Sequence, residues 1–140
     1  MFLLDTNILS AVMAARPDPQ VASWMEEQPP DRLFTAAVCQ AEILSGIAVL
    51  PKGRRREALE MAALAMFRED FSGRILPFDT DAAVIYAALF ALRRSAGRPA
   101  AIADLMIASI ARACGASVVT RDTGDFEGCG LALIDPWSAS

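Results

Sequence analysis

Short apolar runs alternate along the chain with longer segments whose apolar positions recur every three or four residues. The short runs are typical of buried strands, and the longer segments are typical of helices packed on a sheet. The strands are expected at residues 2–4, 32–35, 74–78, 117–120 and 131–134. The helices are expected at residues 7–15, 21–28, 38–50, 54–71, 81–97 and 100–115. This alternation predicts one α/β domain over residues 1–140, with a central, mainly parallel sheet of about five strands.

Turn residues mark where several of these elements end. Pro29 and Pro30 close the second helix, and Asp79 or Thr80 is expected to cap the fifth. Gly115 is expected to end the last helix, because glycine adopts the left-handed backbone conformation without strain. In parallel sheets, ligands bind outside the carboxyl ends of the strands. The residues that follow the first, second and fourth strands are therefore candidates for chemistry.

Three acids follow predicted strands. Asp5 comes directly after the first strand, where by itself it is best explained as the N-cap of the next helix. Asp122 and Asp125 follow the fourth strand in a glycine-containing loop, where turn residues are common. Both places fall on the same edge of a parallel sheet, so the three carboxylates are expected to lie near one another.

Two further acids lie inside predicted helices. Glu42 shares a helix face with small and apolar residues, although a single Glu there is more often partly exposed than bound to a ligand. Asp104 lies early in a helix among apolar neighbours, where it gains from the helix dipole but costs free energy if it is buried. Each acid has a separate structural explanation, whereas one functional site explains all of them together.

The chemistry of such a site follows from its ligands. Carboxylates brought within a few ångströms of one another repel, and burial penalises the charged form of each. A divalent cation removes that penalty. Oxygen ligands without histidine or cysteine suit Mg²⁺ or Mn²⁺ better than Zn²⁺, and such a metal lowers the pKa of a bound water that can act as nucleophile. The candidate ligands are Asp5, Glu42, Asp104, Asp122 and Asp125.

Composition narrows the chemistry further. The chain has no histidine, which excludes Ser-His-Asp and Cys-His nucleophiles and histidine-based acid–base nucleases. The net charge of -4 argues against nucleic-acid binding by bulk positive charge, although an arginine patch or a bound cation can reverse the local field. Three cysteines without C-x-x-C spacing indicate reduced, buried thiols, and these are Cys39, Cys114 and Cys129.

The apolar content of 54% is high for a small domain and indicates either strands buried on both faces or an apolar surface covered by a second copy or an obligate partner. Neither a signal peptide nor a membrane-spanning segment is predicted. We therefore expect a cytoplasmic protein that forms a dimer or binds a protein partner.

Four segments of the chain resemble the PIN-domain ribonucleases, and among these the VapC and FitB type of bacterial toxin. The segments are LLDTNILS with Asp5, AEILSGI with Glu42, IADLMIASIA with Asp104, and VVTRDTGDFEG with Asp122 and Asp125, followed by DPW. They occur in the family's order over nearly the whole chain. The resemblance implies a three-layer α/β/α sandwich whose acids bind one or two Mg²⁺ or Mn²⁺ ions. It also implies hydrolysis of RNA phosphodiester bonds by metal-activated water.

The resemblance assigns roles by position. Asp5, Glu42 and Asp104 match the family's catalytic acids. Asp122 is expected to be the fourth acid and metal ligand, and Asp125 either a further ligand or a residue that orders the loop. The positions expected to support Asp5 or the metal's waters are Thr6, Asn7 and Thr120.

The resemblance also implies partners. These are an RNA substrate, a small antitoxin with a DNA-binding domain, and a second copy of the chain in a homodimer. Residues 53–57 and the pair Arg93 and Arg94 are candidate RNA contacts, although solvated helix faces explain them equally well.

Two other classes of protein share some of these features. A receiver-type signalling domain also gathers acids around Mg²⁺, but it needs an acidic pair after its first strand and a Lys after its last. This chain has DTN at the first place, and Lys52 is its single lysine. A catalytically silent PIN-like binding module is the stronger alternative, and the presence of every candidate acid argues against it.

Overall fold

The computed structural model describes residues 1–138 and contains a five-stranded sheet. The strand pairs are all parallel, and the strands are arranged in the order β3-β2-β1-β4-β5. The strands are β1 (Phe2–Leu4), β2 (Leu33–Ala36), β3 (Ile75–Leu76), β4 (Ser117–Val119) and β5 (Leu133–Ile134). The predicted α/β class and parallel sheet are therefore confirmed.

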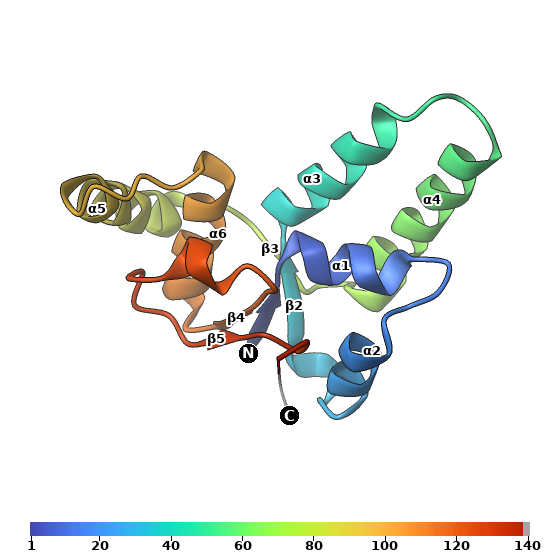
Figure 1. Ribbon diagram of the computed structural model, residues 1–140, viewed down its shortest axis with the longest axis horizontal. Coiled ribbons are helices and arrows are strands. Elements are labelled where there is room, and N and C mark those ends of the chain that lie inside the picture. Colours follow the sequence, from blue (N-terminus) through green and yellow to red (C-terminus); the bar gives the residue numbers. More distant parts are fainter. Residues whose placement is uncertain (139–140) are drawn as a thin grey trace.

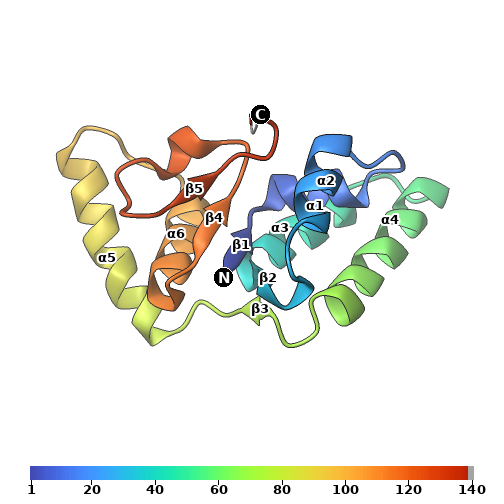
Figure 2. The same ribbon diagram turned by 90° about the horizontal axis from the view of Figure 1, so that it is seen from below.

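Within the described residues, six α-helices flank the sheet. They are α1 (Thr6–Met13), α2 (Pro19–Glu26), α3 (Ala37–Ala48), α4 (Arg54–Ala65), α5 (Thr80–Ser95) and α6 (Ile102–Cys114). Figures 1 and 2 agree in placing α1 to α4 on one side of the sheet and α5 and α6 on the other, which is the expected three-layer arrangement. None of the helices in this part of the chain is both long and apolar enough to cross a membrane. Three short turns are also helical, namely η1 (Pro30–Arg32), η2 (Met66–Asp70) and η3 (Thr123–Phe126).

Strand β1 lies at the centre of the sheet, between β2 and β4. Leu4 pairs with Val119 of β4, and the backbone N–H of Asp5 donates to the Val119 carbonyl at 2.9 Å. The chain runs from β1 to β2 on one side and later returns to β4 on the other, so the strand order switches direction between β1 and β4. Open α/β sheets bind ligands at such a crevice, and the residues just beyond Leu4 and Val119 lie there.

The central strands are buried on both faces. Leu3, Leu4, Val118 and Val119 are fully buried, which explains why these strands read as continuous apolar runs instead of alternating patterns. Phe126 of η3 is also buried and anchors the loop that follows β4. The loop and the strand ends are therefore held by the same core.

The predicted helix caps are confirmed. Asp79 is the N-cap of α5, and its carboxylate accepts the backbone N–H of Ala82 at 2.9 Å. Gly115 ends α6 with a φ of 68°, the left-handed conformation that favours glycine. These caps fix where α5 begins and where the chain turns from α6 into β4.

One predicted helix differs in the structure. The sequence predicts an unbroken helix over residues 54–71, whereas α4 is followed by the π-turn η2. The N–H of Phe71 donates to the carbonyl of Met66, five residues earlier, at 3.0 Å. A π-turn brings residues five apart onto one face, and Met66 and Phe71 are both buried. Burial of this pair accounts for the departure from α-helical spacing.

The cysteines are free, as predicted, but only two of them are buried. Cys39 and Cys129 lie in the core, whereas Cys114 is exposed, so the expectation of a buried thiol is wrong for Cys114. Cys114 is the last residue of α6, where the helix leaves the core before Gly115. Burial raises the pKa of Cys39 to about 12, so this thiol stays protonated.

Candidate metal centre and active site

Asp5 occupies the N-cap position of α1, yet its side chain does more than cap the helix. Its backbone carbonyl accepts the N–H groups of Ile8 and Leu9 at 3.0 and 3.3 Å. One carboxylate oxygen accepts the N–H of Thr6 at 2.8 Å, and the other accepts the hydroxyl of Thr120 at 2.8 Å. Asp5 is 6% exposed, so its carboxylate is fixed between β1 and β4 at the crevice of the sheet. The cap and the functional site therefore use the same residue.

Asn7 links Asp5 to the loop after β4. Its side-chain amide N–H₂ group lies 3.2 Å from the Thr120 hydroxyl and 3.1 Å from the carboxylate of Asp122, and within 3.5 Å of Asp5. Its amide oxygen accepts the backbone N–H of Arg121 at 3.2 Å. The Thr120 hydroxyl also accepts the backbone N–H of Asp122 at 3.0 Å. This network sets the position of Asp122 relative to Asp5.

Glu42 reaches the same edge of the sheet from α3. The hydroxyl of Thr6 donates to the Glu42 carboxylate at 2.7 Å, so Thr6 orients Glu42 while its backbone N–H holds Asp5. Glu42 is exposed, as the single-residue explanation expects. It is nevertheless linked to Asp5 through Thr6, which donates hydrogen bonds to both carboxylates.

Asp104 lies in the first turn of α6 and is half-buried. Its pKa is raised to about 6, first by burial and then, in decreasing order, by the negative charges of Asp125, Asp5, Glu42 and Asp122. The charges of the other four predicted acids therefore all act on the pKa of Asp104. Asp125 acts on it more strongly than Asp122 does, whereas the hydrogen bonds connect Asp122 to Asp5.

The pKa of Asp5 is also shifted by its neighbours in the acidic site. Burial raises its pKa above the ordinary value, the bonds from Thr120 and Thr6 lower it, and the charges of Glu42 and Asp122 raise it again. No arginine or lysine is among the main causes of the pKa shifts of Asp5 and Asp104. The protein therefore gathers negative charge here without supplying a cation to balance it.

These residues fit a divalent metal by their chemistry. The donors are carboxylate oxygens, which suit Mg²⁺ or Mn²⁺, and their uncompensated charge is what a cation would relieve. Among residues 1–138, no group of three or more acidic, cysteine or histidine side chains is already arranged to hold a metal. Mg²⁺ is commonly held by one or two carboxylates with waters completing its shell, and this site matches that pattern rather than a closed protein cage.

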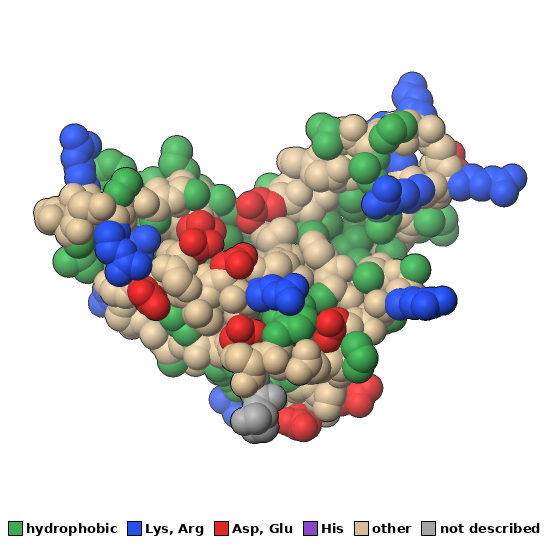
Figure 3. Space-filling view, viewed as in Figure 1, with side chains coloured by type: hydrophobic (Ala, Val, Ile, Leu, Met, Phe, Trp, Pro, Cys, Tyr) green, Lys and Arg blue, Asp and Glu red, His purple; other side chains and the backbone are tan. Residues whose placement is uncertain are grey.

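The surface is hollowed between two raised parts of the molecule. In Figure 3 red side chains gather at the floor of this hollow, and blue side chains stand on the raised parts to either side. A cavity of about 430 Å³ opens beside Thr6 and Glu42, between α1, α3 and α4. Its walls include the apolar side chains of Ile47 and Leu59, and Arg55 stands at its edge.

The two predicted basic clusters behave differently. Residues 54 and 55 are exposed, and Arg56 pairs with Glu60 at 2.8 Å. Arg94 is exposed, whereas Arg93 is only 8% exposed, so the prediction of Arg93 as an RNA contact is wrong. Its Nε and Nη1 donors are already used within the protein.

Arg93 instead ties together the two loops that flank the acids. Its Nε donates to the carbonyl of Arg98 at 2.8 Å, and its Nη1 donates to the carbonyl of Glu127 at 2.6 Å. Arg98 precedes α6, which carries Asp104, and Glu127 follows η3, which carries Asp125. Arg93 therefore links the two segments that lie next to the elements carrying these acids.

Replacing Arg93 with Met is expected to lower the free energy of unfolding by about 1–3 kcal/mol, because two partly buried hydrogen bonds from a charged group are lost. Urea unfolding measures the change. Arg94→Met is the matched control, since it removes the same group from the next, exposed position of α5 and is expected to change stability by less than about 0.5 kcal/mol. Equal losses of stability in the two variants would show that the hydrogen bonds of Arg93 do not stabilise the fold.

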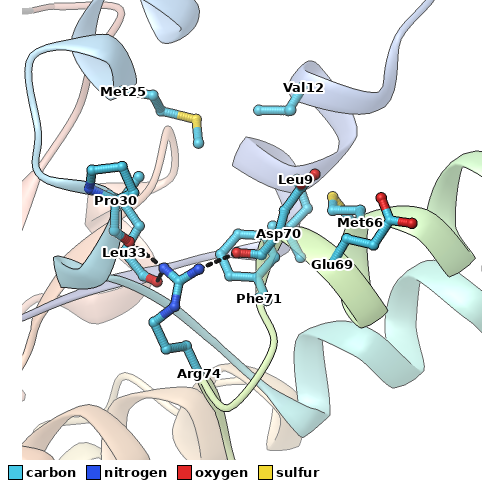
Figure 4. Close-up of a pocket in the computed structure, with 10 residues that line it drawn as sticks. All are labelled: Leu9, Val12, Met25, Pro30, Leu33, Met66, Glu69, Asp70, Phe71 and Arg74. Carbon is cyan, nitrogen blue, oxygen red and sulfur yellow. Dashed lines mark hydrogen bonds between the residues drawn. The ribbon is translucent and has the colours of Figure 1, made fainter.

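A second pocket lies away from the acids. It has a volume of about 350 Å³ and is walled by apolar side chains that include Leu9, Met66 and Phe71. Figure 4 shows the Arg74 guanidinium at its side, where it donates to the carbonyl of Leu33 at 2.9 Å and also bonds the carbonyls of Pro30 and Asp70. None of the predicted site residues lines this pocket, so it is separate from the acidic site.

Sequence reasoning passed over one residue of the site region, Arg121. It stands between Thr120 and Asp122, and its guanidinium lies over the ring of Trp137 at 4.7 Å. The signal was a basic residue placed among the acids directly after a strand. The partner that holds it is 16 positions further along the chain, which only the fold reveals.

Comparison with known proteins agrees with this geometry. The family model described as PIN domain matches residues 2–128. The chain is 39% identical over 137 residues to VapC ribonuclease Y4jK of Sinorhizobium fredii, with 98% of each chain covered. It is 36% identical over 141 residues to Toxin FitB of Neisseria gonorrhoeae, with 98% of this chain and 99% of that protein covered.

A solved structure of FitAB bound to an IR36 DNA fragment superposes with a TM-score of 0.92 at 34% identity, over 100% of this chain and 98% of that one. The agreement in sequence and in fold extends over nearly the whole length of both proteins. The strand order, the acids at the carboxyl edge and these likenesses lead to one conclusion: the chain belongs to the PIN-domain family.

Proposed function

We propose that this protein is a metal-dependent endoribonuclease that acts as the toxin of a toxin–antitoxin pair. The observation that carries the proposal is the gathering of Asp5, Glu42, Asp104 and Asp122 around one crevice, with no cation and no histidine among them. Two relatives support it by name, one as a VapC ribonuclease and one as a toxin, and both match over almost the entire chain.

The side chains of the site position one another. Thr120 and Thr6 hold the two oxygens of the Asp5 carboxylate, Thr6 also orients Glu42, and Asn7 places Asp122. A divalent cation bound to these carboxylates would offset the charge of an RNA phosphate and lower the pKa of a water so that it can attack phosphorus. Asp5 and Asp104 are the proposed central ligands. Glu42 and Asp122 add to the negative charge of the site, and Asp125 adds a further negative charge near Asp104 from the loop.

Partners follow from the same comparison. FitAB is a two-component assembly that binds DNA in its solved structure, and we propose that this chain likewise pairs with a DNA-binding antitoxin. The apolar cavity beside Thr6 and Glu42 is open to a protein segment as well as to RNA. Homodimer formation is also proposed, and the exposed apolar side chains of Val84, Leu92 and Ile102 on α5 and α6 support it. Location in the cytoplasm, where RNA and the antitoxin would be met, stays a prediction.

The proposal is tested by incubating the purified protein with a mixed RNA preparation and either Mg²⁺, Mn²⁺ or EDTA. Cleavage is expected with each metal, none is expected in EDTA, and activity is expected to return when excess Mn²⁺ is added back. RNA that is bound but stays intact under every condition would favour a silent binding module. Cleavage that continues unchanged in EDTA would rule out the metal.

A further inference from the structure

The Arg121 side chain is held in one position at the rim of the acidic site. Its backbone N–H donates to Asn7, which also contacts Asp5 and Asp122, so the residue is anchored to the site itself. Its guanidinium lies 4.7 Å from the centre of the Trp137 ring, within the range of a cation–π interaction. A long and otherwise mobile side chain is thereby given a fixed direction.

Trp137 is fixed in turn by three hydrogen bonds. Its indole N–H donates to the Asp18 carboxylate at 3.0 Å, and its backbone N–H donates to the Asp135 carboxylate at 2.9 Å. Its carbonyl accepts the side-chain amide of Gln20 at 3.1 Å. The aromatic face under Arg121 is therefore a rigid part of the fold, built by α2 and the segment after β5.

Arg121 forms no salt bridge with a described acid, although its charge is the smallest of the causes that act on the lowered pKa of Asp18. No carboxylate among residues 1–138 lies within salt-bridge distance of it, and its guanidinium makes no hydrogen bond to a described residue. It is not among the main causes of the pKa shifts of Asp5 and Asp104 either. Arg121 is exposed, so it remains accessible to a ligand from solvent.

We propose that Arg121 binds a backbone phosphate of the RNA substrate next to the phosphate that is cut, with Trp137 as the support that keeps it in place. The inference rests on the proposed ribonuclease function. An arginine whose planar face is stacked still presents its N–H edge, and that edge matches two phosphate oxygens. A protein of net charge -4 needs such local cations to hold RNA over its own acids.

The test uses a fluorescein-labelled, mixed-sequence RNA 20-mer and measures two quantities. Steady-state cleavage in Mn²⁺ gives KM and kcat for wild type and Arg121→Gln. Fluorescence anisotropy gives the dissociation constant in the Asp5→Asn background, with and without Arg121→Gln, where the RNA stays intact. We expect KM and the dissociation constant to rise about tenfold, as for loss of a charged hydrogen bond, with kcat changed less than about twofold.

Salt dependence identifies the contact as one with phosphate. The slope of log binding constant against log salt is expected to become shallower by about 0.7 for one phosphate contact on a single strand. Arg121→Lys is expected to recover part of the affinity, and Trp137→Leu to lose part of it, because the first keeps charge without stacking and the second keeps charge without support. Arg16→Gln, three residues beyond the C-terminal end of α1, is the matched control for a change in net charge and is expected to bind as wild type does.

The outcomes separate this inference from the proposed function. Wild type that neither binds nor cuts the RNA contradicts the ribonuclease itself. Wild type that cuts RNA while Arg121→Gln has the same KM, affinity and salt slope overturns the role of Arg121, and would be seen if this arginine served a protein partner instead. Losses in Arg16→Gln as large as those in Arg121→Gln would also overturn it, since net charge alone would then explain them.

Discussion

Asp5→Asn is expected to abolish metal-dependent RNA cleavage, lowering kcat/KM by about 10³-fold or more, while the protein stays folded. The physical reason lies in the two tasks of this residue. Asparagine caps helices about as well as aspartate, and the backbone carbonyl of residue 5, which accepts the N–H groups of Ile8 and Leu9, is unchanged. The substitution removes the negative charge, which is the property that a metal needs.

The matched control is Asp79→Asn, which makes the same substitution at the N-cap of α5, away from the acids. Both variants are expected to unfold thermally within a few degrees of wild type, and only Asp79→Asn is expected to cleave RNA. Isothermal titration with Mn²⁺ gives an independent reading, because the Asp5 variant should bind the ion more weakly. If Asp5→Asn cuts RNA at the wild-type rate and still requires metal, Asp5 is a cap and not a ligand.

Asp104→Asn is expected to make the metal-free protein more stable and at the same time inactive. Asp104 carries an unfavourable charge in the fold, as its pKa of about 6 indicates, and asparagine removes that charge with little change in shape. Because the side chain is only half-buried, we expect a gain on the order of 1 kcal/mol at pH 7.5, well below the full value of such a shift. Urea unfolding in EDTA measures it.

The raised pKa of Asp104 also predicts how the stability of the metal-free protein changes with pH. Between the unfolded pKa of 3.8 and the folded pKa of about 6, folded Asp104 holds its proton more tightly than the unfolded chain does. The stability of the metal-free wild type should therefore fall as pH rises through this window, and Asp104→Asn should show a smaller fall. Added Mn²⁺ should raise the thermal midpoint of the wild type more at pH 7.5 than at pH 5, and should raise that of the variant less at both. A variant that is less stable than wild type in EDTA at pH 7.5 would contradict the account.

The sequence predicts the sheet well because each strand follows from its own apolar residues. Runs such as FLL and SVV are buried on both faces, so no partner needs to be known to recognise them. The π-turn η2 could not be predicted in this way. It depends on which side of the helix meets the core, and the burial of Met66 and Phe71 together decides that only after the fold has formed.

The positions of the acids could likewise be predicted only in part. Asp5 and Asp122 could be placed at one edge from strand order alone, since both follow strands of a parallel sheet. The sequence could not show that Asp122 is linked to Asp5 through Asn7 while Asp125 acts more strongly on Asp104. This difference depends on the hydrogen bond from Asn7 and on the approach of the loop to α6. Arg93 was misassigned for a related reason. A pair of arginines at a helix end looks the same in sequence whether one of them faces solvent or closes a loop.

The hydrogen bond between Thr120 and Asp5 spans 115 positions of the chain, and it has a consequence for timing. A ribosome releases Asp5 long before it has joined Thr120, and during that interval the carboxylate lacks the strand and the hydroxyl that fix it. Contacts between such distant segments also form late in folding, because a large loop must close first. A growing or truncated polypeptide therefore has no assembled site. The site can therefore act in the cell only after the chain has been synthesised past Thr120 and has folded.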